Sequence, residues 1–324
     1  MNLQSLLAIL AAATLAVAGG AAQAEGFPAK PVRLVVPQAP GGASDALARI
    51  VGQKLSERWG QPVVVENRVG AGGNIGTEAV AKSAADCYTL LMAYVGTHAI
   101  NAALYKKLPF DPNRDFATVA TLATVPFVMV VNAAVAAKDV QELVALARTK
   151  PGGLTYASAG NGSVNHLLGE MFNMATKVKL VHVPYKGAAP ALTDLISGQV
   201  QIAFTSMPSV IQHIRAGTLR ALAVTSARRS ATLPDVPTLA EFGLAGFDVN
   251  PWFGILGPAG TPAETVKQIN ADIGAVLRMK EVQERFAGQG AEPFITTPEQ
   301  FNEFARADVA KWAVVVKESG ATVD

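Results

Sequence analysis

Hydrophobic residues along the chain alternate between short continuous runs and longer segments in which they recur every three or four positions. The first such pair is the run 32–36, followed by a segment that places apolar residues from Leu47 to Leu55 on one face before Trp59. A continuous apolar run is typical of a strand buried on both faces, and the wider spacing is typical of an amphipathic helix. The pattern predicts a strand and then a helix, the unit of a parallel sheet covered by helices.

The same alternation continues to the end of the chain. Further strands are predicted at 63–65, 88–93, 127–131, 154–157, 179–183, 202–204, 219–224 and 252–256, and further helices at 77–83, 140–148, 165–175, 188–196, 209–216, 262–277 and 298–316. About 300 residues exceed what one hydrophobic core usually serves, so two α/β units are expected. Because no long polar linker separates them, the chain is expected to cross between the units by ordered strands, which would act as a hinge.

The N-terminal segment has the features of an export signal. The apolar stretch 6–18 is too short to span a bilayer comfortably and is followed by the small-residue site Ala22-Gln23-Ala24. We predict a signal peptide at 1–24, cleavage before Glu25, and a periplasmic protein. The first five residues contain no Lys or Arg, and an uncleaved anchor is the alternative.

Charge and cysteine content narrow the function classes. The 27 basic and 25 acidic residues nearly balance, and no Lys/Arg cluster alternates with aromatic residues, which argues against nucleic-acid binding. Cys87 is the single cysteine, so an internal disulfide is impossible and stability must come from packing. The four histidines, His98, His166, His182 and His213, lack the short spacing of metal ligands, so neither a metal nor a cofactor is expected.

Two Gly-rich turns carry the candidate chemistry. The turns 40–45 and 158–163 each stand between a predicted strand and a predicted helix. The first N–H groups of a helix lack intrahelical partners and favour anions. Two such helix ends facing each other could clamp one carboxylate without a cationic side chain.

Two enzyme classes are alternatives to a carboxylate-binding protein. Gly70, Gly72 and Gly76 form a fingerprint-like run for an NAD-dependent enzyme, but Ile75 stands where that pattern needs glycine. The run 42–46 lacks the final glycine of a serine hydrolase nucleophile elbow. Binding without a reaction is therefore favoured.

The motifs resemble those of the tripartite tricarboxylate transporter receptors, also called the Bug family. The resemblance rests on the order and spacing of the segments 36–45, 66–68, 70–76, 88–91, 156–163, 166–167, 183–187, 233–238 and 252–254. It implies a two-lobed Venus-flytrap receptor, each lobe a mainly parallel sheet flanked by helices. Lobe 1 would comprise 25–124 and 227–324, and lobe 2 would comprise 125–226.

The resemblance also implies a function and a site. Such a receptor captures a small carboxylated solute and presents it to membrane permease subunits, or serves as a sensor without transport, and we expect a monomer. The expected ligand-binding residues are Gln38, Ala39, Gly41, Gly42, Ala43, Ser44, Asp45, Ser158, Gly160, Asn161, Gly162, Ser163, His166, Thr205 and Ser206.

The residue types refine several of these roles. For Asp45, capping and loop ordering are favoured over ligand contact, because its charge would repel a carboxylate. Ser163 is expected either to cap its helix or to bind solute, and His166 either to support its loop or to touch solute. The other three histidines are expected to be structural or surface residues.

Three positions depart from the family pattern. Gln38 replaces a frequent aromatic residue, so an amide is expected to hydrogen-bond a hydroxyl or a second carboxylate of the solute. Cys87 replaces the glycine of a turn, and the change to glycine is expected to raise the melting temperature if that position needs positive φ. Thr205 replaces a common acidic residue, which makes a solute amino group a less favoured ligand. Which carboxylate is bound stays open.

Overall fold

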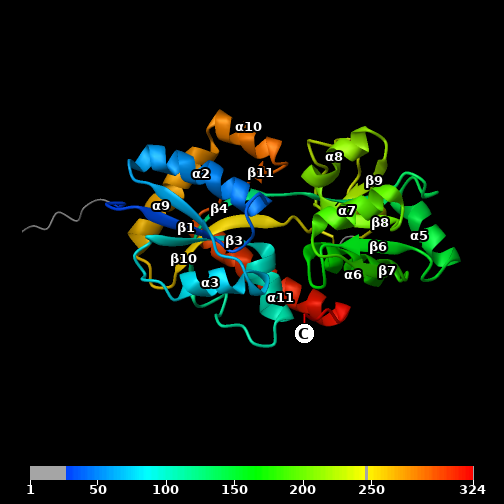
Figure 1. Ribbon diagram of the computed structural model, residues 1–324, viewed down its shortest axis with the longest axis horizontal. Helices are drawn as coiled ribbons and strands as arrows, with labels where there is room; N and C mark the ends of the chain where they lie inside the picture. The colour runs from blue at the N-terminus through cyan, green and yellow to red at the C-terminus, as the bar shows by residue number, and fades with distance from the viewer. Residues whose placement is uncertain (1–26, 245–246, 324) are drawn as a thin grey trace, which may run out of the picture.

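Two separate β-sheets, each flanked by helices, make up the protein (Figure 1). The computed structural model describes residues 27–244 and 247–323, so the predicted signal peptide lies outside the described residues. The sheet that contains β1 defines the first lobe, and the sheet that contains β6 defines the second. The predicted two-lobed α/β fold is confirmed.

The first lobe has the strand order β11-β4-β10-β3-β1-β2. Its strands are β1 (Val32–Val36), β2 (Val63–Asn67), β3 (Thr89–Tyr94), β4 (Phe116–Thr124), β10 (Trp252–Pro258) and β11 (Glu292–Pro293). Its helices are α2 (Ala43–Trp59), α3 (Asn74–Ala81), α4 (Asn101–Leu104), α9 (Ala263–Leu277), α10 (Lys280–Gly288) and α11 (Pro298–Ser319), with a 3-10 turn η1 (Ala71–Gly73) and a π-helical turn η2 (Gly96–Ile100).

The second lobe has the order β7-β6-β8-β5-β9. Its strands are β5 (Phe127–Asn132), β6 (Thr155–Ser158), β7 (Val181–Pro184), β8 (Ile202–Ser206) and β9 (Leu219–Val224). Its helices are α5 (Val140–Thr149), α6 (Val164–Thr176), α7 (Ala188–Ser197) and α8 (Met207–Arg215), and a 3-10 turn η3 (Ala240–Phe242) follows them along the chain.

The direction of the strands places the two Gly-rich turns each at one edge of its sheet. In the first lobe β1 pairs in parallel with β2 and β3, and β10 is antiparallel to both β3 and β4. In the second lobe β6 pairs in parallel with β7 and β8, while β5 is antiparallel to β8 and β9. Most strands in each sheet therefore run in one direction, as predicted, and both Gly-rich turns lie at carboxyl ends of parallel strands.

Two chain segments cross between the lobes and are hydrogen-bonded to each other. The first lies between β4 and β5, and the second leads from β9 back to β10. The N–H of Val125 in the first donates to the carbonyl of Pro251 in the second, at 2.9 Å. The reversed strands β5 and β10 each begin directly after a crossing, which explains their antiparallel pairing.

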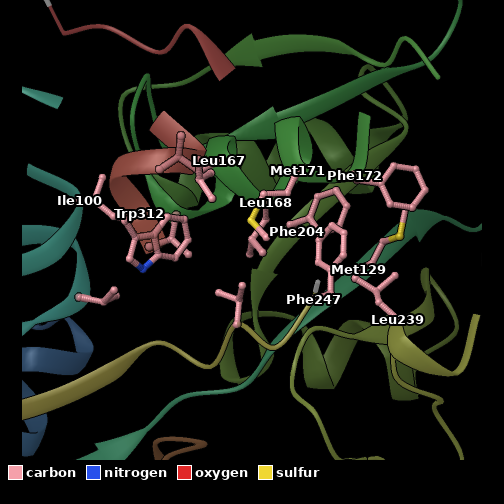
Figure 2. Packing of buried hydrophobic residues seen from close by; sticks show 14 of the residues in the cluster. Ile100, Met129, Leu167, Leu168, Met171, Phe172, Phe204, Leu239, Phe247 and Trp312 are labelled. Carbon is pink, nitrogen blue, oxygen red and sulfur yellow. The ribbon is translucent and has the colours of Figure 1, made fainter. Parts of the chain in front are cut away.

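The hydrophobic core is continuous between the lobes on the side of α11. Trp312 of α11 is 1 % exposed and belongs to the same cluster as Ile100 of the first lobe and Leu167 of the second. Figure 2 shows the indole between these two side chains, with the cluster extending to Phe172 and Phe204. The lobes are thus joined by apolar packing as well as by the crossing segments.

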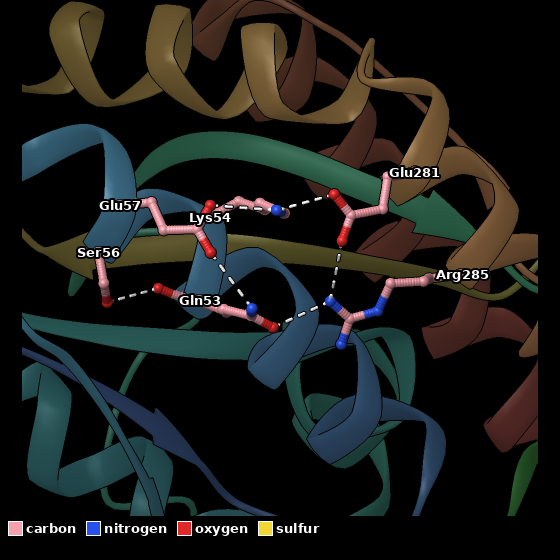
Figure 3. A network of polar contacts seen from close by, with 7 residues as sticks. Gln53, Lys54, Ser56, Glu57, Glu281 and Arg285 are labelled. Atoms are coloured by element: carbon pink, nitrogen blue, oxygen red, sulfur yellow. Dashed lines mark hydrogen bonds and ion pairs between the residues drawn. The ribbon is translucent and has the colours of Figure 1, made fainter.

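A polar network fixes α10, a helix that the sequence pattern did not predict. Lys54 on α2 pairs with Glu281 on α10 at 2.8 Å, and Arg285 Nη1 donates to Gln53 Oε1 at 2.9 Å (Figure 3). Only Val282 and Phe286 of α10 are buried. Such a short apolar pattern cannot be distinguished from a loop in the sequence. The two buried side chains pack into the core of the first lobe, and the polar contacts join the exposed face of α10 to α2.

The turn before β3 confirms the conformation expected at Cys87. Its φ is +62°, a left-handed value that costs any residue with a Cβ about 1 kcal/mol or more. The side chain is fully buried, and burial raises the pKa of the thiol to about 11. Glycine would relieve the backbone strain but would also remove a packed sulfur atom.

A pair of variants separates these two effects. Cys87→Ala and Cys87→Gly both lose the thiol, but only the glycine variant relieves the backbone. We expect Cys87→Gly to be more stable than Cys87→Ala by about 1 kcal/mol, measured by urea unfolding. Equal stabilities would show that the turn stores no strain.

Candidate ligand-binding site

The first Gly-rich turn leaves the N-terminus of α2 without a side-chain cap. The N-cap residue is Gly42, and within the part of the chain that the structure describes no side chain caps the first turn. The first helical bond runs from the N–H of Ala46 to the carbonyl of Gly42, at 3.0 Å. The N–H groups of Ala43, Ser44 and Asp45 precede that bond and lack intrahelical acceptors, which makes this helix end a ready anion site.

Asp45 holds the shape of this turn. Its Oδ2 accepts from the N–H of Gly41 at 3.0 Å, its Oδ1 accepts from Asn67 Nδ2 at 2.9 Å, and Arg49 pairs with it at 2.9 Å. Burial alone would raise the pKa of Asp45, but these partners outweigh burial and lower it. The predicted loop-ordering role is supported. The prediction that Asp45 caps α2 is wrong, because Gly42 occupies the N-cap and Asp45 lies inside the first turn.

Gln38 has a polar side chain that the protein itself does not satisfy. Among the described residues, neither its Nε2 nor its Oε1 has a hydrogen-bond partner, and both atoms are buried from solvent. Its backbone carbonyl is fixed by Asn67 Nδ2 at 3.1 Å. An unpartnered buried amide is costly, which makes the side chain of Gln38 a candidate contact for a bound molecule.

The second Gly-rich turn is largely satisfied by its own side chains. Ser163 is the N-cap of α6, where its Oγ accepts from the N–H of His166 at 3.3 Å and donates to the carbonyl of Gly160 at 2.7 Å. Ser158 Oγ accepts from the N–H of Gly160 at 3.1 Å. Capping by Ser163 is thereby confirmed, and both serine hydroxyls act inside the loop.

A stacked pair of histidines supports the same turn. His166 Nδ1 accepts from the N–H of Gly162 at 3.0 Å, and its ring lies 3.9 Å from that of His182. His182 Nε2 lies 2.6 Å from Ser158 Oγ. Burial lowers the pKa of both imidazoles, that of His182 to about 4, and the neighbouring His166 adds to the effect on His182. His166 therefore supports the loop in its neutral form. The role of His182 has no specific signal in the sequence, because it depends on the pairing of β6 with β7.

The second turn also touches the first lobe. A Cβ at Gly162, whose φ is +72°, would overlap the side chain of Leu104 at the end of α4. Beside this turn, Ser158, Asn165 and Thr205 line a cavity of about 10 Å³, which has room for about one water molecule. Asn165 Nδ2 donates to the carbonyl of Phe204 at 2.7 Å, which fixes α6 against the end of β8.

The remaining predicted site residues lie on the same two edges. The exposed ones are Ala39, Gly41, Gly42 and Asn161. The half-buried ones are Gln38, Ala43, Gly160, Ser163 and Ser206, and the buried ones are Ser44, Asp45, Ser158, Gly162, His166 and Thr205. Ser206 Oγ bonds Ser209 Oγ at 2.8 Å. Asn67, Arg49 and His182 were not predicted as site residues, although they hold the two turns in place.

Two lobes joined by crossing segments, with Gly-rich turns at the carboxyl ends of their parallel strands, define a solute-binding protein of the periplasmic type. A family profile described as the tripartite tricarboxylate transporter family receptor matches residues 47–321. The protein BugT of Bordetella pertussis (strain Tohama I) is 42 % identical over 324 residues, covering 99 % of each chain. The chain therefore belongs to the tripartite tricarboxylate transporter receptor, or Bug, family.

Solved structures agree with this assignment. A Rhodopseudomonas palustris protein solved with adipate is 38 % identical, with a TM-score of 0.81 over 91 % of this chain and 99 % of its own. MatC of the same organism, with bound malate, is 34 % identical, with a TM-score of 0.75 over 90 % and 100 %. The periplasmic binding protein BugD is 35 % identical, with a TM-score of 0.77 over 91 % and 99 %. The chain is thus a solute-binding receptor and not an enzyme.

The histidine pair generates a prediction about pH. A histidine whose pKa is lowered in the folded state stabilises the fold above its unfolded pKa of about 6.5, and this contribution is lost as pH falls towards the folded pKa. For His182 the window is from about pH 6.5 to about 4. The titratable group that acts on the stack from outside it is Glu170, which accepts from the Tyr156 hydroxyl at 2.5 Å and opposes the lowering of the pKa of His166.

We expect His182→Gln to lose less stability than the wild type on acidification. The difference between pH 7 and pH 4.5 should be about 1 to 2 kcal/mol in unfolding free energy, measured by urea titration at each pH. His213→Gln, a histidine on α8 outside the stack, is the matched control and should follow the wild type. Parallel curves for wild type and His182→Gln would contradict the assignment.

Proposed function

We propose that this receptor captures a small carboxylated solute between its two Gly-rich turns and delivers it to permease subunits of the tripartite tricarboxylate type. The uncapped N-terminus of α2 is the observation that carries the proposal. Three consecutive N–H groups without intrahelical acceptors can bind one carboxylate oxygen pair by charge-assisted bonds. The bound adipate and malate of the two R. palustris relatives support the same class of ligand.

The negative charge of Asp45 does not oppose the binding of a carboxylate at this helix end. Arg49 neutralises the carboxylate, and both Asp45 oxygens are engaged by the loop. A solute carboxylate on the helix end therefore meets the N–H groups of α2 and a compensated ion pair. The family's pairing of turns needs no arginine in direct contact with solute.

The two turns are proposed to act unequally. The second turn is already capped by Ser163 and held by His166, so it can receive solute on a preformed surface with little reorganisation. The first turn keeps its unsatisfied donors and the amide of Gln38 for the solute. We propose that Gln38 bonds a hydroxyl or a second carboxylate, with Thr205 and Ser206 at the far side of the cleft.

The rest of the proposed assignment concerns the mature receptor. Its lobes would be 25–124 with 227–324, and 125–226, after cleavage of a signal peptide at 1–24. The receptor would act as a monomer in the periplasm. An exported ligand sensor with the same binding site and no permease is the second candidate, since capture alone serves both.

A thermal-shift panel on the mature protein tests capture. Adipate, malate, citrate, benzoate and glutamate are compared, with NAD as a control for the dehydrogenase alternative. A ligand at a hundred times its Kd contributes about 2.7 kcal/mol, a shift of a few degrees. If no acid shifts the protein, and mass spectrometry of the denatured protein finds no retained acid, carboxylate capture is wrong.

Removal of one donor at the helix end should weaken binding without unfolding the protein. Proline is well tolerated at the first position of a helix, so Ala43→Pro deletes one N–H of α2 at little structural cost. We expect the affinity for the carboxylate found in the panel to fall about tenfold or more, measured by calorimetry.

Lys280→Pro is the matched control. Lys280 is exposed and is the first residue of α10, so the same substitution is made at the start of another helix of the first lobe. Lys280→Pro should leave the affinity for the carboxylate unchanged. Equal losses in both variants would mean that Ala43→Pro acts through the fold rather than through the missing donor.

Gln38→Leu should affect stability and binding in opposite directions. Leucine has a similar size and no polar atoms to leave unsatisfied, so the ligand-free protein is expected to gain about 1 kcal/mol. Affinity for hydroxylated or multiply carboxylated solutes should fall, while affinity for a simple monocarboxylate changes little. Thermal unfolding and calorimetry measure the two effects, and unchanged affinity for every solute would exclude a ligand role for Gln38.

A further inference from the structure

A second cavity lies between the returning crossing segment and α11. Its volume is about 230 Å³, and its lining includes Val95 at the end of β3, residues 248–251 and the side chains of Phe304, Asp308 and Trp312 on α11. None of its lining residues belongs to the two Gly-rich turns. The cavity therefore has its own walls and its own chemistry.

Two carboxylates, Asp248 and Asp308, and one ammonium, Lys311, are the charged groups of the lining. Asp308 Oδ2 accepts from Trp252 Nε1 at 2.7 Å, which leaves Oδ1 for another donor. Burial raises the pKa of Asp308, although the Trp252 bond and the charge of Lys311 oppose that rise. The ammonium of Lys311 donates to the backbone carbonyl of Asp248, and among the described residues it makes no ion pair with the Asp308 carboxylate.

Two side chains of the lining have buried polar atoms without partners. Among the described residues, Asn250 Oδ1 and Trp312 Nε1 make no hydrogen bond. The indole of Trp312 is close enough to Asp308 to help lower its pKa, but it does not meet it with hydrogen-bonding geometry. In Figure 2 the indole lies at the edge of the apolar cluster, beside Ile100. Asn250 Oδ1 and Asp308 Oδ1 can therefore each accept a hydrogen bond from a bound molecule.

We propose that this cavity binds a small organic ammonium ion. An ammonium group supplies three donors, which suits Asp308 Oδ1 and Asn250 Oδ1 together, and its charge compensates a buried carboxylate. The aromatic walls Phe304 and Trp312 favour a cation over a neutral molecule and accommodate a short alkyl chain. An anion would meet Asp308, so the site selects the opposite charge from the Gly-rich turns.

Indole resonances provide a direct test on the full mature protein. The chain has three tryptophans, Trp59, Trp252 and Trp312, which are assigned in ¹H–¹⁵N spectra by single Trp→Phe variants. Trp59 Nε1 is bonded to Asp272 Oδ2 at 2.8 Å, away from the cavity lining, and serves as an internal reference. Butylammonium chloride is the probe, with 1-butanol and sodium butyrate as the neutral and anionic counterparts.

Saturable shifts of Trp252 and Trp312, with Trp59 unmoved, are expected for butylammonium only. Asp308→Asn retains an acceptor for Trp252 and should reduce the affinity about tenfold or more. Asp248→Asn removes an exposed charge from the same lining but keeps the backbone carbonyl that Lys311 uses, and should change the affinity less than threefold, by about 0.6 kcal/mol at most.

Three outcomes would overturn the proposal. They are the absence of a saturable shift, equal shifts with 1-butanol, and equal losses of affinity in the two aspartate variants. The first would mean that water fills the cavity. The second would mean that the cavity binds any apolar chain, whatever its charge. The third would mean that the cation is attracted by the surface charge in general. Carboxylate capture at the Gly-rich turns is measured separately and is independent of all three.

Discussion

The free N–H groups at the start of α2 are the constraint on which the candidate site depends. A parallel strand followed by a helix puts the helix N-terminus at the carboxyl edge of the sheet, and the first turn cannot satisfy its own donors. Among the described α-helices, α5, α6 and α11 meet this need with a side-chain cap from Asp139, Ser163 and Thr297, whereas the others, α2 included, have no such cap. At α2 the N-cap is glycine, and the Asp45 carboxylate accepts hydrogen bonds from Gly41 and Asn67 instead of from the first turn. The donors are thereby ordered and left open.

Asn67 shows how the first turn is made rigid without being filled. Its amide donates both to the backbone of Gln38 and to Asp45, so the end of β2 fixes the loop that follows β1. Arg49 completes the arrangement by bonding both Asp45 and Asn67. Preorganised donors lose little entropy on binding, which is why a backbone site can be effective with few charged side chains. The second turn reaches the same rigidity by the opposite route, with its serines and histidines bonded inward.

Local patterns in the sequence were sufficient for most of the fold and for the position of both turns. The run Val32–Val36 and the face formed by Leu47 and Leu55 lie where they were expected. The strand β4 was missed because Thr and Ala alternate through it without a distinct apolar run, and α10 was missed because it buries two side chains only. The hydrogen bond between Asn67 and Asp45 joins residues 22 positions apart, and the stacking of His166 on His182 joins residues 16 positions apart. Such contacts depend on which strands become neighbours, and no local spacing records them.

Among the described residues, four side chains have buried polar atoms without partners, and all but His98 lie where the lobes meet or where solute is expected. Gln38 lies on the first turn, and Asn250 and Trp312 line the cavity beside the returning crossing segment. Each costs folding free energy in the bare chain, and the cost is tolerable because one apolar cluster joins the lobes through Trp312, Ile100 and Leu167. Groups that are satisfied only when something is bound convert binding directly into stability of the liganded form, while the apolar contact keeps the lobes in register without it.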